Sequence, residues 1–129
     1  MSEHFKSEEF WCKCNEPDCD GRRDPHPGLV LELEVMRQLY GKPIVITSGI
    51  RCPKQNAASG GVKDSEHLTG EGADLACPTS RDRYDMLVAA TRSGFRRVGI
   101  GKTFMHVGVS RTLQSDVCWT YYPKGEGNG

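Results

Sequence analysis

The chain has 129 residues and a mass of 14.3 kDa, the size of one compact domain. Its 17 basic and 17 acidic side chains cancel, so the basic excess typical of nucleic-acid-binding proteins is missing. No apolar run reaches the length of a membrane span, and the N-terminal segment MSEHFKSEEF lacks the basic and apolar regions of a secretory signal. We therefore expect a protein that is made in the cytoplasm and binds neither nucleic acid nor membranes.

The N-terminal third contains one strong helix signal. Ser7 suits the start of a single helical turn, and the segment 12–27, rich in Asp, Pro, Gly and Cys, is typical of an irregular loop. From Pro27, apolar residues recur at helical spacing up to Gly41, which suits the C-terminal cap. The pattern predicts a helix over residues 27–40.

The rest of the chain predicts a second long helix and five strands. Thr79 or Ser80 can cap a helix that ends at Gly94. Apolar stretches predict strands at residues 43–48, 72–77, 97–101, 103–109 and 117–122. This order predicts an α+β fold in which helices flank a small, mostly antiparallel sheet. We expect one domain over residues 1–122 and a flexible, glycine-rich tail over residues 123–129.

Cysteine is unusually frequent. The six cysteines are Cys12, Cys14, Cys19, Cys52, Cys77 and Cys118. Three of them crowd into CKCNEPDC, whereas thiolate zinc sites usually show two pairs with two to four residues inside each pair. One interpretation is a zinc knuckle with Cys52 or His26 as a distant fourth ligand. The other, which the missing second pair favours, is a loop of reduced or partly paired cysteines apart from any catalytic site.

The segment SEHLTGEGADLAC carries the first two candidate metal ligands. His67 and Asp74 are seven positions apart, about two turns of a regular helix, which would hold the side chains too far apart for one ion. Gly70 and Gly72 lie between them and allow the chain to turn, so that Asp74 enters from a strand. Imidazole and carboxylate are both common zinc ligands.

The third candidate ligand lies in the strand predicted from TFMHVGV. Because side chains alternate along a strand, Phe104, His106 and Gly108 share one face, and Met105 and Val107 share the other. His106 therefore has room beside it for an ion.

These motifs resemble those of the zinc D-alanyl-D-alanine carboxypeptidases and their relatives. That family includes VanX-like dipeptidases and phage L-alanyl-D-glutamate endopeptidases and has a hedgehog-like fold. Its pattern Ser-x-His-x-x-Gly-x-Ala-x-Asp, followed later by Phe-x-His-Val, is similar to SEHLTGEGAD and FMHVG here, with Gly72 at the alanine position. The segment SGIRC and the closing Trp119 are also similar, so the resemblance runs from about Phe5 to Trp119.

The resemblance implies one zinc ion per chain, held by His67, Asp74 and His106. It implies that Arg51 binds substrate and stabilises the developing oxyanion, a task suited to a permanently charged fork of donors. Without the resemblance, Arg51 would be assigned to a loop salt bridge. Ser65 is the further residue expected to bind substrate, and the implied partner is a stem peptide of peptidoglycan, bound by a monomer.

The sequence departs from the family pattern at the positions that carry the general base. Relatives carry an acidic residue or His two or three positions before the third ligand, or an Asp two positions after it; here Thr103, Phe104 and Gly108 occupy these places. The acidic side chains of the neighbouring segment are the remaining candidates: Asp64, Glu66 and Glu71. Of these we assign the catalytic role to Glu66, so competence for catalysis depends on a residue outside the family pattern.

Two functions follow. The first is a zinc peptidase of phage or prophage type, a cell-wall hydrolase that acts as carboxypeptidase or endolysin and is released by lysis or carried on the virion. The second is a weak or inactive zinc-binding module of the same fold that holds cell-wall peptide, such as a phage tail component.

Overall fold

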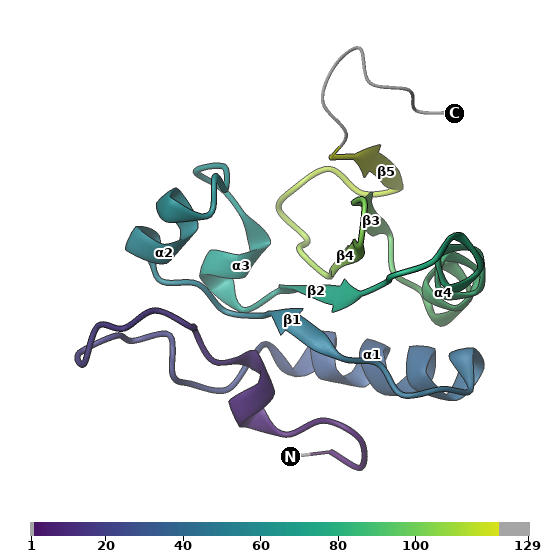
Figure 1. The fold of residues 1–129 in the computed structure, drawn as a ribbon, viewed down its shortest axis with the longest axis horizontal. Coiled ribbons are helices and arrows are strands. Elements are labelled where there is room, and N and C mark those ends of the chain that lie inside the picture. Colours follow the sequence, from purple (N-terminus) through teal and green to yellow (C-terminus); the bar gives the residue numbers. More distant parts are fainter. Residues whose placement is uncertain (1, 122–129) are drawn as a thin grey trace.

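The computed structural model describes residues 2–121, and its centre is a five-stranded sheet within that range (Figure 1). The strands are β1 (Ile46–Ser48), β2 (Gly72–Ala76), β3 (Arg97–Ile100), β4 (Phe104–Gly108) and β5 (Val117–Thr120). Their order across the sheet is β1-β2-β4-β3-β5, and only the β3–β5 pair is parallel. The predicted α+β class with a mostly antiparallel sheet is confirmed.

Capping residues mark where the two long helices begin and end. The helices are α1 (Pro27–Tyr40), α2 (Pro53–Ala58), α3 (Glu66–Thr69) and α4 (Ser80–Ser93), preceded by a 3-10 turn at Ser7–Phe10. Helix α1 ends at Gly41 with φ 75°, and α4 starts after Thr79, whose hydroxyl accepts a hydrogen bond from Asp82. Both long helices therefore match their predicted bounds. The first strand is shorter than predicted, and the single turn α3 was not predicted.

The two faces of the sheet differ in composition. Alternation along β2 and β4 turns Leu75, Met105 and Val107 into the hydrophobic core, which they share with apolar side chains of α1 and α4 such as Leu33 and Met86. The residues between them, with Asp74 and His106 as a directly opposed pair, face the other way. The core thus forms one rigid side of the sheet, and its polar side is left for a site.

Residue 122 and the predicted tail over 123–129 lie outside the described residues. None of the helices within residues 2–121 combines the length and apolarity that crossing a bilayer requires.

Candidate metal centre

Three buried side chains converge on the polar face of the sheet. Asp74 and His106 come from the paired strands β2 and β4, and His67 comes from α3. Asp74 Oδ1 lies 3.0 Å from His106 Nδ1 and 3.2 Å from His67 Nε2. The three residues that the sequence predicted as ligands therefore share one centre.

The turn α3 brings His67 to this centre. Ser65 caps the turn, since its Oγ accepts a hydrogen bond from the His67 backbone N–H at 3.2 Å. Gly70 ends α3 in the left-handed region, with φ 75°, a conformation that costs glycine little. The chain then reverses into β2. The expected turn at Gly70 is confirmed, with a single helical turn before it.

The hydrogen bonds behind the two imidazoles fix which nitrogens face the centre. His67 Nδ1 lies 2.6 Å from the carbonyl oxygen of Gly49, and His106 Nε2 lies 2.9 Å from Glu66 Oε1. Both partners only accept, so in neutral imidazoles these nitrogens carry the proton. The lone pairs of His67 Nε2 and His106 Nδ1 then point at Asp74 Oδ1, an arrangement that a metal ion between the three atoms would satisfy.

The donor set fits zinc. Ligands about 2.0–2.1 Å from a tetrahedral zinc ion lie roughly 3.3 Å from one another, close to the two separations observed here. Burial raises the pKa of Asp74, but the contacts of its carboxylate with the His106 and His67 rings outweigh burial and hold the pKa of Asp74 well below its ordinary value. Asp74 is therefore present as the carboxylate that a metal requires.

Arg51 lies against the outer oxygen of Asp74. Its Nη2 is 3.2 Å from Asp74 Oδ2, and its Nε donates to Ser48 Oγ at 3.1 Å. The backbone N–H of Arg51 also donates to the carbonyl of His67 at 2.8 Å. Arg51 thus orients one candidate ligand and is itself fixed to the segment that carries another.

A cavity of about 580 Å³ opens over the centre. Its polar wall includes Arg51, Asp64 and Ser65, and its aromatic wall consists of Phe104, Trp119 and Tyr121. The Trp119 ring lies 5.6 Å from the ring of His106, and the rings of Phe104 and Tyr121 lie 5.0 Å apart. The arrangement is a half-open cleft, apolar on one side and charged on the other.

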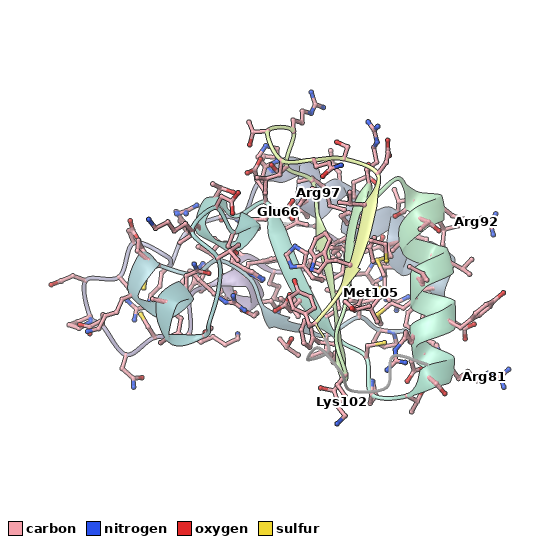
Figure 2. All side chains as sticks on the ribbon, turned by 90° about the horizontal axis from the view of Figure 1, so that it is seen from above. Glu66, Arg81, Arg92, Arg97, Lys102 and Met105 are labelled. Carbon is pink, nitrogen blue, oxygen red and sulfur yellow. The ribbon has the colours of Figure 1, made fainter. Side chains whose placement is uncertain are left out.

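Glu66 is buried behind His106, with its side chain 1% exposed. Figure 2 shows it close to Arg97. Glu66 Oε1 accepts from His106 Nε2, its Oε2 accepts from the Ser110 backbone N–H at 2.9 Å, and Arg97 Nε lies 3.0 Å from Oε1. Burial raises the pKa of Glu66, but His106 and the Ser110 N–H outweigh it, so the net shift is downward. The carboxylate is ionised, and both oxygens are engaged.

The place of Glu66 explains two departures from the family pattern. Gly72 and Gly108 are opposed across β2 and β4, and the Glu66 side chain lies over this pair. A Cβ at Gly108 would lie 2.0–2.2 Å from the Glu66 carboxylate, and one at Gly72 would lie 2.7 Å from Glu66 Cβ. The space of the expected aspartate at position 108 is thus filled by a carboxylate from position 66, and its absence from the motif leaves no gap.

The structure brings together all six residues predicted for the site. They are Arg51, Ser65, Glu66, His67, Asp74 and His106. Asp64 also lines the cavity, whereas Glu71 is half-buried outside it and its Oε1 accepts a hydrogen bond from Thr69 at 2.5 Å. The sequence analysis did not predict that Arg97 contacts Glu66. This contact follows from the pairing of β3 with β4, which sets Arg97 opposite Gly108.

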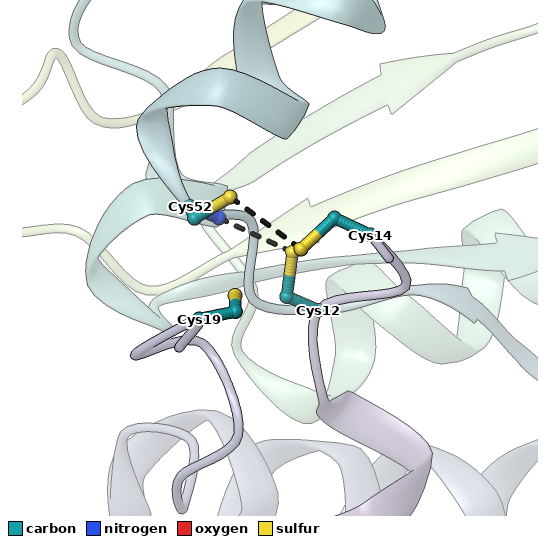
Figure 3. A group of neighbouring side chains, drawn as sticks. All are labelled: Cys12, Cys14, Cys19 and Cys52. Carbon is teal, nitrogen blue, oxygen red and sulfur yellow. Dashed lines mark hydrogen bonds between the residues drawn. The ribbon is translucent and has the colours of Figure 1, made fainter. Parts of the chain in front are cut away.

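The N-terminal cysteines do not enter this centre. Cys12, Cys14 and Cys19 gather with Cys52 in a separate group (Figure 3). The other proposed fourth ligand, His26, caps α1 through a hydrogen bond from Gly28 to its Nδ1 at 3.0 Å.

Comparison with known proteins identifies the family of the chain. A family model described as Peptidase M15 matches residues 3–110, which include all three candidate ligands. No curated protein matches the sequence.

Proposed function

Since the chain belongs to the peptidase M15 family, we propose that it hydrolyses a peptide bond beside a D-amino acid in the stem peptides of bacterial peptidoglycan. The family consists of zinc-dependent metallopeptidases that act on cell-wall peptides. The observation that carries the proposal is the convergence of His67, Asp74 and His106 under a half-open cleft beside Arg51. Carboxypeptidase and endopeptidase action both fit this cleft.

One zinc ion per chain would be held by His67 Nε2, Asp74 Oδ1 and His106 Nδ1. When bound, zinc polarises the scissile carbonyl and makes a water molecule more acidic. The protein contributes the orientation of its ligands. The Gly49 carbonyl holds the ring of His67, Glu66 holds the ring of His106, and Arg51 holds Asp74.

Arg51 is proposed to bind substrate as well. Two of its nitrogens are engaged by Ser48 and Asp74, and Nη1 has no hydrogen-bond partner among residues 2–121. This nitrogen is available to a substrate carboxylate or to the oxyanion that forms when the carbonyl is attacked. The Ser65 hydroxyl is proposed to donate a hydrogen bond to a peptide carbonyl of the substrate. Its oxygen already accepts a hydrogen bond from the backbone N–H of His67, and its own hydrogen is left to donate.

The proposed catalytic role of Glu66 is indirect. Its oxygens are engaged by His106, Arg97 and Ser110, so Glu66 positions His106 and strengthens it as a ligand. Asp64 is the acidic side chain on the cavity wall without a hydrogen-bond partner in the described part of the chain. We assign proton transfer to Asp64: it takes a proton from the attacking water and returns it to the amine as the C–N bond breaks.

The second candidate function is binding without turnover. The exposure of Asp64 favours it, because no hydrogen bond from the described residues holds this side chain in place for proton transfer. A zinc-binding protein of phage or prophage type that holds stem peptide on a virion would need the same cleft and the same Arg51.

Incubation of the zinc-loaded protein with purified peptidoglycan separates the two functions. A peptidase releases new amino groups and soluble peptides, and the release stops with a chelator or with His106→Ala. A binding module sediments with the cell wall and releases nothing. Full activity after complete removal of zinc would refute both functions.

A further inference from the structure

A second group of metal-ligating side chains lies outside the catalytic cleft. Cys12 and Cys14 come from the N-terminal loop, Cys19 comes from the same loop five residues later, and Cys52 precedes α2 (Figure 3). All four Sγ atoms lie within 4.8 Å of one another, and every one of these cysteines is a free thiol. The fold thus assembles a four-sulfur group from segments more than thirty residues apart.

The spacing of the sulfurs matches a metal site. Zinc binds thiolate sulfur at about 2.3 Å, so the sulfurs of a tetrahedral site lie roughly 3.8 Å apart. The Sγ atoms of Cys14 and Cys52 are 3.8 Å apart. A disulfide would require about 2.05 Å.

Backbone N–H groups point at three of the sulfurs. Cys12 Sγ accepts from the N–H of Cys52 at 3.4 Å, Cys19 Sγ from Gly21 at 3.3 Å, and Cys52 Sγ from Gln55 at 3.4 Å. Such donors stabilise thiolates, and hydrogen bonds to the ligand atoms are a regular feature of metal sites.

Gly21 is required by the packing of this group. A Cβ at this position would lie 2.4 Å from Cys12 Cβ and 3.3 Å from Cys19 Sγ. Its carbonyl accepts a hydrogen bond from the N–H of Cys12 at 3.0 Å, so the two arms of the loop lie against each other. The loop therefore closes only with glycine there, and this closure brings Cys19 to the other sulfurs.

We propose that Cys12, Cys14, Cys19 and Cys52 bind a second, structural zinc ion. Four thiolates in a closed tetrahedron leave no open position for substrate, which is typical of structural zinc. The ion would join the irregular loop to the residue that follows Arg51. Lys54 and Glu16 form an ion pair across the same junction, in addition to the sulfur group.

This site has a structural consequence for the cleft. Arg51 is adjacent to Cys52 in the chain, and Ile50 donates a backbone hydrogen bond to Phe10 at 2.7 Å. The loop that the metal would order thus supports the segment that positions Arg51. The proposal concerns a different ion from that of the cleft and does not depend on peptidase activity.

Metal analysis of the purified protein tests the proposal. We expect two zinc ions per chain in the native protein, one in Cys12→Ser or Cys52→Ser, and one in His67→Ala. Cys118→Ser is the matched control, because Cys118 is exposed on β5 and stands outside the group, and it should keep both ions. Retention of both ions in Cys52→Ser, or a cysteine-independent single ion in the native protein, would overturn the proposal.

A measurement on the native cysteines covers the case in which these variants fail to fold. Cobalt added to metal-free His67→Ala should give intense thiolate-to-metal charge-transfer absorption and the visible bands of a tetrahedral site. Intact mass under non-reducing conditions and the iron content complete the test. A mass lowered by two hydrogens per disulfide, or iron in place of zinc, would contradict a zinc-thiolate site.

Discussion

Because the Glu66 carboxylate lies directly against Gly108, we expect that even Gly108→Ala lowers both the stability of the protein and its affinity for zinc. The new methyl carbon would lie 2.0 Å from Glu66 Oε2, whereas a normal contact is about 3.5 Å, so the carboxylate must move by roughly 1.5 Å. Gly108 is not among the glycines with positive φ, so alanine strains no backbone there. The effect of the substitution therefore reports on the carboxylate.

The magnitude follows from what Glu66 would lose. Displacement breaks its hydrogen bonds from His106 and Ser110 and its ion pair with Arg97, all in a side chain that is 1% exposed. Breaking a buried charge pair costs about 3–5 kcal/mol. Loss of the group behind a histidine ligand weakens metal binding by about 10–100-fold.

Urea unfolding and competition with a zinc chelator measure the two effects. The control moves the carboxylate from position 66 to position 108. Gly108→Asp alone should lose stability and zinc affinity, and Gly108→Asp combined with Glu66→Ala should recover both. The expected coupling between positions 66 and 108 is about 0.5–3 kcal/mol in favour of the double variant. A Gly108→Ala protein whose stability lies within about 0.5 kcal/mol of that of the native protein, with unchanged zinc affinity, would refute the claim that Glu66 is packed against Gly108 and holds His106.

Three further predictions concern single side chains. Arg51→Lys should keep the fold and the zinc and lower kcat/KM by about 10²–10³-fold, measured with peptidoglycan peptides, because a lysine cannot hold Asp74 and substrate together. Asp64→Asn should lower kcat by about 10²–10⁴-fold at unchanged zinc content, with activity that rises with pH as hydroxide replaces the base; an unchanged pH profile would exclude Asp64. Burial raises the pKa of Glu32, whose Oε2 has no hydrogen-bond partner within residues 2–121. Since the pKa of Glu32 is higher in the folded than in the unfolded protein, stability falls as the pH rises from the unfolded pKa through the folded pKa. Glu32→Gln should remove this fall. In urea unfolding at neutral pH, the variant should be more stable by about 0.5 kcal/mol.

Local patterns predicted the long helices and, together with the family resemblance, the candidate metal ligands. Helix α1 carries an apolar stripe along its 14 residues, α4 starts after the capping residue Thr79, and both helices end at a glycine. These signals each lie within one segment of the chain. His106 could be placed because strand alternation separates it from Met105 and Val107. Four residues, as in α3, are too few to show a period, so the turn that holds His67 left no pattern to read.

What the sequence did not reveal depends on pairing between distant segments. Glu66 reaches Gly108 only because β2 and β4 are neighbours in the sheet although β3 lies between them in the chain. Cys52 joins the N-terminal cysteines only because α2 starts beside their loop. The two family departures, Gly72 and Gly108, were the available clue, since both reduce side-chain size at positions that turned out to be opposed.

Hydrolysis of a stem peptide in ¹⁸O-labelled water tests the central claim most directly. If the zinc-loaded protein is a peptidase, mass spectrometry will find one ¹⁸O atom in the new carboxylate of the acyl product and none in the released amine. His106→Ala, with its ligand set incomplete, should give no labelled product. Tight binding of the peptide by the zinc-loaded native protein with no labelled product would contradict the peptidase and leave a binding module.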